Sequence, residues 1–464
     1  MIKPQTVKFL FFDYCDYEYV RGFARRLGQP HKYAGNPTMR PQPPHDYQNV
    51  HLYGTVLRDP RDGYFKMWYT TWNDQGSYVL YATSPEGYNW TRPKLDVVPG
   101  SNIVMGPAFK PHGPSVLLDL EELDDSKRFK LLMHPAGSPA IQAYYSPDGI
   151  HWQQAQPDPV IAAPSDSHIG FYRDPANGLY HCSFRLRGCD RRVWLSESAD
   201  CLHWTRPVLG IEPDVDDGAQ TQFYGMTMTP YGNYVLGWLS VLHTEESDLH
   251  YGKVQGSLDV ELAYSRDGYC WHRAAREFIP RGAPGSWEAG MVLPSTGPVL
   301  LEHKLLFAYS GTPYGHGEHA PTAPECVGAA TLRVDGFVSL HAGEEPGELI
   351  TRQFAVHEPG VYVNADALEG EVRVAICDGI TAKPLAGFTF EDCVPLRGSG
   401  IAQPVRWAGN PDPGIMVNRP IRLAVQARQA ELYSVFMPNG ADPSRYWEFR
   451  EITGCDPMLD IKEH

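Results

Sequence analysis

The chain has 464 residues with 55 acidic and 40 basic side chains, a net charge of −15 with histidine neutral. This balance argues against a nucleic-acid partner, because neutralising phosphates requires clustered Lys and Arg. The 44 glycines, 41 prolines and 12% aromatic residues favour a turn-rich all-β protein, and no stretch approaches the roughly 18 apolar residues of a membrane span.

The first residues and the cysteines indicate a reducing compartment. Residues 1–13 contain a short apolar run without a small-residue cleavage site, so we expect a soluble, cytoplasmic protein with no membrane partner. The nine cysteines are an odd number and contain no C-x-x-C pair. They predict neither a disulfide framework nor a zinc site, and we interpret them as buried free thiols.

Residues 8–40 precede any repeat and are expected to form a strand and an irregular arm. The apolar run 9–12 is followed by Asp13 and by several charged residues. We expect this arm to close a ring of later repeats. Asp13 is interpreted as part of that cap, with contact to a central site as the alternative.

A seven-residue motif recurs along the next 300 residues. Its clear copies have the form Ser-x-(Asp/Glu)-x-x-x-Trp and begin at Ser84, Ser146, Ser198 and Ser265, with a degenerate copy at Arg333. Each lies between alternating apolar segments, as a hairpin turn does. Second hairpin signals precede the copies, at 58–63, 124–127, 173–178, 231–233 and 302–304.

Two hairpins in each of five units predict five four-stranded blades, and therefore a five-bladed β-propeller. The expected blade cores are 47–95, 110–155, 166–207, 220–274 and 288–340; a pair of sandwiches is the alternative fold. After about residue 350 short alternating strands predict a C-terminal β-sandwich. The expected domains are thus a propeller with its N-terminal arm at 1–345 and a sandwich at 346–464.

These features resemble a known group of enzymes. The repeat and the trailing sandwich are similar to the furanosidase-type glycoside hydrolases, the five-bladed propellers of families 32, 43, 62 and 68, and above all to bacterial family-32-like proteins. The resemblance implies a glycosidase with no cofactor beyond, in some members, a calcium ion in the central tunnel. The matching segments are 54–56, 66–69, 221–225, 262–268, 335–340 and 384–388.

The chain departs from that group's catalytic motifs. The nucleophile motif W-M-N-D-P-N-G is absent, and residues 35–38, its nearest analogue, lack the carboxylate. Arg-Asp-Pro occurs at Asp174 but recurs at Asp59 in the equivalent hairpin, which favours a turn role. Glu325-Cys326 matches the acid motif by letters only, and we interpret this match as coincidental.

Residues at the start of each innermost strand are expected to face a pocket at one end of the propeller. Glycoside hydrolysis needs a carboxylic acid and a second carboxylate. We therefore predict Glu288 as the general acid, Asp46 as nucleophile or base, and Asp166 as the group that orients the sugar or tunes the acid. The alternative is that they are solvated carboxylates in loops between blades.

Sugars are bound by aromatic platforms and planar hydrogen-bonding groups. His316 and His319 flank a carboxylate, but they lack the helical i, i+4 spacing of a zincin and are not predicted to bind metal. The predicted substrate-binding residues are His112, His168, Gln222, Tyr224, Trp287, Asp13 and Asp174.

The leading interpretation is an exo-acting glycosidase that releases a terminal sugar, such as fructose or arabinose, from an oligosaccharide. A glycoside phosphorylase on the same scaffold is the first alternative, and it would need basic side chains such as Arg185 or Arg187 near the acid. A non-catalytic carbohydrate-binding propeller is the second. The sequence leaves open the sugar, the linkage and whether the chain forms an oligomer.

Overall fold

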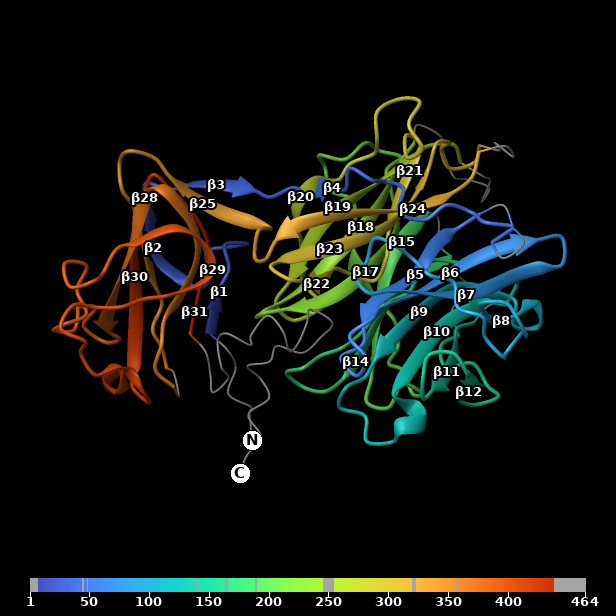
Figure 1. Cartoon of the computed structure of the whole chain (residues 1–464), viewed down its shortest axis with the longest axis horizontal. Helices are drawn as coiled ribbons and strands as arrows, with labels where there is room; N and C mark the ends of the chain where they lie inside the picture. Colours follow the sequence, from blue (N-terminus) through green and yellow to red (C-terminus); the bar gives the residue numbers. More distant parts are fainter. Residues whose placement is uncertain are drawn as a thin grey trace.

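The computed structural model describes residues 7–437, except 44–45, 48, 139, 163–165, 188–189, 245–253, 319–322 and 356–357. These residues form β-strands with three short 3-10 helices, which confirms the all-β prediction. Two parts are visible in Figure 1: a larger one built from residues 51–333 and a smaller one that holds the C-terminal strands. None of the helices in the described ranges has the length and apolar character needed to cross a membrane.

The first three sheets of the larger part have four antiparallel strands each, in chain order. The predicted hairpins at 58–63, 124–127 and 173–178 connect the first two strands of each sheet. The strands are β5 (His51–Arg58), β6 (Phe65–Asn73), β7 (Gly76–Ser84) and β8 (Ile103–Met105); β9 (Pro111–Leu118), β10 (Phe129–Pro135), β11 (Gln142–Ser146) and β12 (Gln153–Gln154); and β13 (Gly170–Arg173), β14 (Tyr180–Arg187), β15 (Arg191–Ser198) and β16 (Val208–Ile211).

A nine-stranded sheet completes the larger part, and it consists of two antiparallel groups. A single parallel contact between Leu258 and Met291 joins the groups. The first group is β17 (Gln222–Tyr231), β18 (Tyr234–His243), β19 (Ser257–Ser265) and β20 (Trp271–Ile279); the second is β21 (Met291–Pro294), β22 (Val299–Leu301), β23 (Lys304–Thr312) and β24 (Cys326–Arg333), with β4 (His31–Lys32) on its outer edge.

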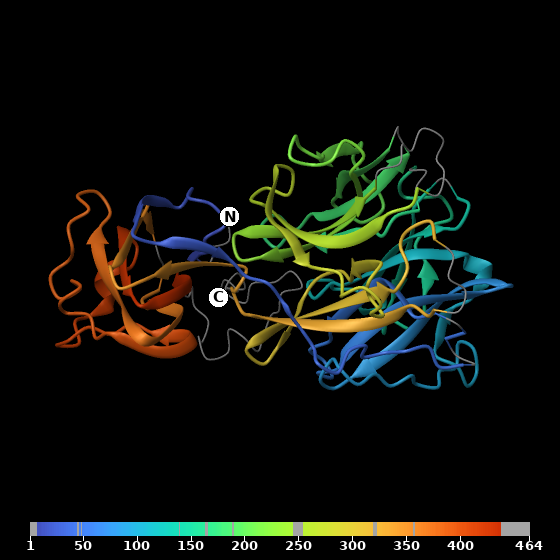
Figure 2. The same ribbon diagram turned by 90° about the horizontal axis from the view of Figure 1, so that it is seen from above.

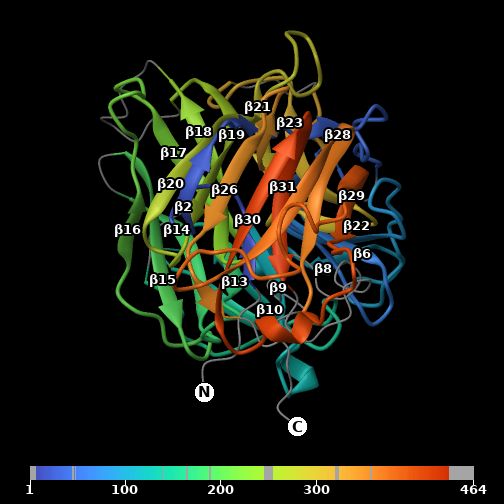
Figure 3. The same ribbon diagram turned by 90° about the vertical axis from the view of Figure 1, so that its left-hand side faces the viewer.

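The smaller part is a ten-stranded sheet, seen face on in Figure 3. Three of its strands come from the N-terminal segment, which then crosses to the larger part and ends in β4 (Figure 2). The strands are β1 (Val7–Phe9), β2 (Tyr17–Arg21), β3 (Ala24–Leu27), β25 (Val338–Ala342), β26 (Gly347–Thr351), β27 (Phe354–Ala355), β28 (Tyr362–Asp378), β29 (Leu396–Pro404), β30 (Pro420–Arg428) and β31 (Ala430–Met437).

The recurring serine motif forms the same hydrogen-bonded turn in three of the sheets. The Ser84, Ser146 and Ser265 hydroxyls accept the amide of the residue three positions later, at 2.8 to 2.9 Å. The degenerate copy differs, because Asp335 itself adopts a φ of 61° and turns its side chain inward. These serines are therefore turn residues, as their repetition predicted.

A buried ion pair holds the two parts together. The Asp335 carboxylate is fully buried and accepts hydrogen bonds from Lys8 Nζ at 2.9 Å, from Tyr231 and from Ser434. Burial alone would raise the Asp335 pKa, but Lys8 and these hydrogen bonds outweigh it and hold the pKa below its usual value. The apolar core runs without interruption across the same junction, through residues such as Phe337.

Candidate functional site

The first strands of the sheets pack against one another in the larger part, β5 against β9 and β21, and β13 against β9 and β17. Their amino-terminal ends carry polar and aromatic side chains. His51 and Tyr53 lie on β5 and Gln222 and Tyr224 on β17. Residues two apart on a strand share a face. The sheets thus bring together side chains that are far apart in the sequence.

Tyr53 is at the centre of an aromatic and imidazole cluster. Its ring centroid lies 4.8 Å from that of His168, 4.9 Å from His51, 5.9 Å from His112 and 6.5 Å from Tyr224. We call these five residues the Tyr53 cluster. Its members come from four different sheets or from the loops that lead into them.

The buried groups of the Tyr53 cluster are uncharged. Burial, together with the nearby His51 and Arg185, lowers the pKa of His112 to about 4. Burial and the same His51 lower the pKa of His168 to about 3, and burial raises the pKa of the Tyr53 hydroxyl. All three groups are therefore neutral at physiological pH.

Three polar atoms of this cluster are buried without a hydrogen-bond partner among the described residues. They are the Tyr53 hydroxyl, Nδ1 of His112 and Nε2 of His168. Buried polar groups in proteins are almost always paired, and an unpaired one costs about 1–3 kcal/mol. Their concentration around one ring indicates a place where a ligand supplies the missing partners.

Two carboxylates flank the cluster. Glu325 Oε2 lies 2.6 Å from Nδ1 of His51, and the Tyr314 hydroxyl donates to Oε1 at 3.1 Å. Asp166 forms an ion pair with Arg185, whose guanidinium lies 4.8 Å from the Tyr224 ring centroid. The Glu325 side chain is 7% exposed, whereas that of Asp166 is 65% exposed. One carboxylate is thus enclosed and the other is open to solvent.

Positive charge borders the same cluster. The Arg191 guanidinium lies 5.6 Å from the Tyr224 ring centroid, beside that of Arg185. Arg191 Nη1 also donates to Gln222 Oε1 at 2.6 Å. Gln222, a predicted substrate-binding residue, is thus held by an arginine at the edge of the cluster.

The predicted catalytic residues are not brought together. Asp46 is fully buried; it accepts the Tyr69 hydroxyl at 2.6 Å and forms an ion pair with Arg92. Glu288 forms a separate ion pair with Lys32 of β4, at 2.9 Å. No contact among the described residues joins any two of Asp46, Asp166 and Glu288. Only Asp166 lies beside the Tyr53 cluster.

Trp287 is a packing residue rather than an exposed platform. Its ring stacks on that of Tyr309 with a centroid distance of 6.0 Å. Gly311 and Gly328 lie so close that an added Cβ would come within 2.4 and 2.8 Å of the indole. Trp287 is therefore packed on one side against the sheet that follows it and is only partly buried.

Asp13 and Asp174 also lie apart from the site. Asp13 forms a two-bond ion pair with Arg266 of a serine-motif turn, which agrees with the capping interpretation. Asp174 accepts the Ala176 amide at 2.8 Å, just as Asp59 accepts the Arg61 amide at 3.0 Å. Asp174 is thus a turn residue at the far ends of β13 and β14, as the repeated Arg-Asp-Pro favoured.

The sequence analysis missed His51, Tyr53 and Glu325 as site residues. Glu325 comes close to β5 because its carbonyl accepts the Val50 amide at 3.2 Å, a contact between segments 275 residues apart. The letter match Glu325-Cys326 was a usable signal that we interpreted as coincidental. His51 and Tyr53 could have been found from their i, i+2 spacing beside the matched segment 54–56.

No metal centre is evident in the ranges that the structure describes. They contain no group of three or more His, Cys, Asp or Glu side chains able to hold a metal ion. His319 lies outside those ranges, whereas His316 Nδ1 contacts the Val254 carbonyl oxygen at 2.5 Å. A calcium ion in the tunnel stays a prediction.

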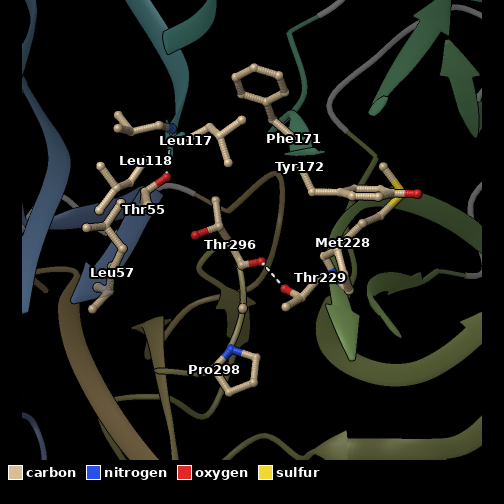
Figure 4. Close-up of a pocket in the computed structure, with 14 residues that line it drawn as sticks. Thr55, Leu57, Leu117, Leu118, Phe171, Tyr172, Met228, Thr229, Thr296 and Pro298 are labelled. Atoms are coloured by element: carbon tan, nitrogen blue, oxygen red, sulfur yellow. Dashed lines mark hydrogen bonds between the residues drawn. The ribbon is translucent and has the colours of Figure 1, made fainter. Parts of the chain in front are cut away.

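The opposite ends of the first strands form a narrow opening with a volume of about 30 Å³ (Figure 4). Leu57, Leu118 and Met228 are among the side chains that line it. Thr229 also lines it, and its hydroxyl donates to the Thr296 carbonyl at 3.0 Å. The lining of this opening is mostly apolar and contains no carboxylate, imidazole or basic side chain.

Comparison with known proteins gives only distant similarities. No family model and no curated protein matches the chain. Among solved structures, a glycosyl hydrolase from Bacteroides ovatus shares 15% identity over 66% of this chain and 94% of its own, with a TM-score of 0.46. A β-1,2-mannobiose phosphorylase from Listeria innocua, in complex with β-1,2-mannobiose, shares 13% over 66% and 98%, with a TM-score of 0.48.

An α-L-arabinofuranosidase from Podospora anserina, in complex with cellotriose, shares 13% identity over 66% of this chain and 98% of its own, with a TM-score of 0.46. TM-scores below 0.5 at such identities carry no argument about the activity of this chain. The case for a function therefore rests on the side chains described above.

Proposed function

We propose that this protein is a carbohydrate-active enzyme that cleaves glycosidic bonds at the Tyr53 cluster. The observation that carries the proposal is the set of unpaired buried atoms on Tyr53, His112 and His168, gathered around aromatic rings. A sugar fits such a site, because its hydroxyls satisfy neutral donors and acceptors while its C–H face packs on a ring.

The proposed architecture is a five-bladed propeller followed by a second domain from about residue 346. Three four-stranded sheets and the two groups of the nine-stranded sheet would be the blades, with β4 as the last strand of the fifth. The order of strands within each sheet and the contacts among first strands support this proposal. The N-terminal strands β1 to β3 would then belong with the second domain, to which they are hydrogen-bonded.

Glycoside hydrolysis needs one group that protonates the leaving oxygen and a carboxylate that attacks or activates water. We assign the first role to Glu325, because its 2.6 Å contact with His51 allows a proton to pass between them. We assign the second to Asp166, because its pairing with Arg185 keeps a negative charge at the cluster. Asp166 thus keeps a catalytic role, whereas Asp46 and Glu288 would act as buried structural ions.

Phosphorolysis is the second candidate, and one observation favours it. Two guanidinium groups, those of Arg185 and Arg191, border one face of the cluster at Tyr224. Arginine is well suited to bind phosphate with two parallel hydrogen bonds. The side chain of Arg187, the other arginine expected in this role, lies outside the described residues. Exo action on a furanoside stays part of the proposal for the hydrolase.

The test is a reducing-sugar assay on a panel of fructosides, arabinosides and other oligosaccharides, with and without inorganic phosphate. The variants are Glu325→Gln and Asp166→Asn, with Asp174→Asn as a matched control, because asparagine preserves the turn at that position. We expect release by the wild type and by Asp174→Asn, and a loss of about 100-fold or more in the other two. Dependence on phosphate would identify the phosphorylase.

Two outcomes would contradict this assignment. Full activity in both Glu325→Gln and Asp166→Asn, with loss in Glu288→Gln, would move the site to the residues predicted from the sequence. Oligosaccharide binding without release of any sugar, under any condition, would favour a non-catalytic carbohydrate-binding protein. The Tyr53 cluster would then be its binding site only if His168→Phe weakened that binding.

A further inference from the structure

A groove with a volume of about 770 Å³ lies where the smaller part meets the outer edge of the nine-stranded sheet. It is formed by the segment between β3 and β4, the turn into β23, the end of β24 and strands of the ten-stranded sheet. Pockets for small molecules usually measure about 300–1,000 Å³. Its lining includes Arg26, His31, His303, Lys304, Arg333 and Tyr433.

Two like charges face each other in this groove. Lys304 is the first residue of β23 and Arg333 the last of β24, and the two are direct partners in the register of the strands. Side chains directly opposite each other in a sheet interact, and like charges there destabilise the pair. The chain has a net charge of −15, so acidic residues that could pair with these two cations are abundant in the sequence. The placement of two cations opposite each other is therefore unexpected.

Neither cation has a carboxylate within ion-pair distance in the described part of the chain. Arg333 donates to neutral acceptors: the Asn364 side chain at 2.8 Å, the Ser399 hydroxyl at 3.1 Å and the Gly400 carbonyl at 2.9 Å. The one glutamate that lines the groove, Glu431, pairs with Arg26 at 3.1 Å and also contacts His341. Neither cation is therefore in a direct ion pair within the described residues, although the more distant carboxylates of Asp366 and Asp335 act on Arg333 electrostatically.

Arg333 is held in a fixed orientation. It donates hydrogen bonds to two strands of the smaller part, β28 and β29, and its guanidinium lies 4.7 Å from the Tyr433 ring centroid. Such stacking adds to the hydrogen bonds in fixing the guanidinium. Lys304, in contrast, is exposed at the start of its strand and can move toward a bound group. A rigid cation beside a mobile one is a suitable pair for one compact dianion.

We propose that this groove binds a small phosphorylated metabolite, with its phosphomonoester between Lys304 and Arg333. A phosphomonoester carries about −1.5 to −2 charges at neutral pH, which matches the two cations. Its binding would remove the repulsion between them. The groove has room for an attached sugar-sized group, and the exposed His31 and His303 flank that space. This site is separate from the Tyr53 cluster and does not depend on the proposed activity.

The test is calorimetric titration of the full chain with glucose 6-phosphate, inorganic phosphate and glucose. The variants are Lys304→Gln and Lys304→Glu, with Lys94→Gln as a control at another exposed lysine. We expect glucose 6-phosphate to bind to the wild type and to Lys94→Gln alike, at least tenfold more weakly to Lys304→Gln, and not detectably to Lys304→Glu. Glucose should not bind to this groove in any of them.

A second measurement guards against loss of binding through misfolding. Lys304→Glu places opposite charges across the strand pair, so its melting temperature should rise even as binding is lost. Equal affinity in the wild type and Lys304→Gln would overturn the proposal, and would point instead to Arg185 and Arg191 as the phosphate ligands. Inorganic phosphate binding as tightly as glucose 6-phosphate would also overturn it, because the attached group would then contribute nothing.

Discussion

The two ends of the first strands are equally buried but satisfy their polar groups differently. At the amino-terminal end, the Tyr53 hydroxyl and ring nitrogens of His112 and His168 have no partner among the described residues. At the other end, the hydroxyls of Thr227 and Thr229 donate to backbone carbonyls at 2.8 and 3.0 Å. The threonine hydroxyls are thus satisfied within the chain, although Ser295 Oγ beside them is also unpaired among the described residues, whereas the unpaired atoms of the amino-terminal end gather around one aromatic ring.

Ion pairs show the same contrast. At the carboxyl-terminal ends, Asp59 contacts Lys66 of its own sheet at 2.6 Å and also Arg128 of the next sheet. Asp119 repeats this arrangement one sheet later, with Lys130 and Arg173 at 3.3 and 3.0 Å. These networks join neighbouring sheets. The carboxylates at the site end contact fewer charged groups: Glu325 contacts His51 and the Tyr314 hydroxyl, and Asp166 pairs with Arg185.

The largest expected effect comes from breaking one inter-sheet network. Asp59→Ala leaves Lys66 and Arg128 buried without their carboxylate, which should lower the free energy of unfolding by about 3–5 kcal/mol. Urea unfolding measures this loss. Asp62→Asn is the matched control, because Asp62 also contacts Lys66, at 3.0 Å, but is exposed. A similar small loss in both variants would mean that the network contributes little.

The next effect concerns chemistry rather than stability. Glu325→Gln keeps the shape of the side chain but removes the proton that it would share with His51, so kcat should fall about 100-fold, or about 2.7 kcal/mol in barrier height. The melting temperature should change by only a few degrees. An unchanged kcat on a substrate that the wild type cleaves would remove Glu325 from the mechanism.

The neutral histidines also predict how stability depends on pH. Burial lowers the pKa of His112 to about 4 and those of His134 and His168 to about 3 in the folded state. The unfolded chain takes up protons near pH 6.5, where the folded chain does not. The free energy of unfolding should therefore fall as the pH is lowered from about 6.5 towards 4, and His168→Phe should make this decline shallower. A decline of equal slope in the variant would contradict the low pKa of His168.

How much of the fold and of the proposed site could be predicted from the sequence depends on how far apart along the chain the interacting residues lie. The hairpins and serine-motif turns were predictable, because their hydrogen bonds join residues two or three positions apart. The pairing of β1 with β31 was not, since it joins Val7 to Met437 with no local signal. The same limit applies to the proposed site: Asp166 was predicted from its place before a strand, whereas the contact of Glu325 with His51 spans 274 residues.

The misplaced candidates show a second limit. Asp46 and Glu288 were predicted as site residues because polar groups at strand starts are unusual in a core. Their partners Arg92 and Lys32 come from other segments of the chain and form ion pairs with them, although Glu288 Oε2 is still buried without a hydrogen-bond partner among the described residues. A sequence shows where a charge lies along the chain but not whether a counter-charge meets it. The comparison between satisfied and unsatisfied groups therefore requires the structure.

A smaller effect is expected when an unsatisfied group is replaced by an apolar one. His168→Phe removes the unpaired Nε2 but also the hydrogen bond of the ring to the Gly54 backbone, so the two effects offset and stability at neutral pH should change little. Affinity for an oligosaccharide substrate or inhibitor should fall about tenfold, which corresponds to about 1.4 kcal/mol. Calorimetry and thermal unfolding of the same samples separate the two quantities. A large loss of stability with unchanged affinity would show that His168 is structural.

The smallest expected effect tests the other end of the same strands. Thr229→Val keeps the shape of the side chain but removes the hydroxyl that donates to the Thr296 carbonyl, which is then left without this donor. The expected cost is about 1 kcal/mol of unfolding free energy, because this hydrogen bond is satisfied within the chain. Ligand affinity should not change. The two substitutions therefore have opposite expected effects. His168→Phe should weaken ligand binding but leave stability nearly unchanged, whereas Thr229→Val should lower stability but leave ligand binding unchanged. The same effect in both variants would mean that the two ends do not differ in function.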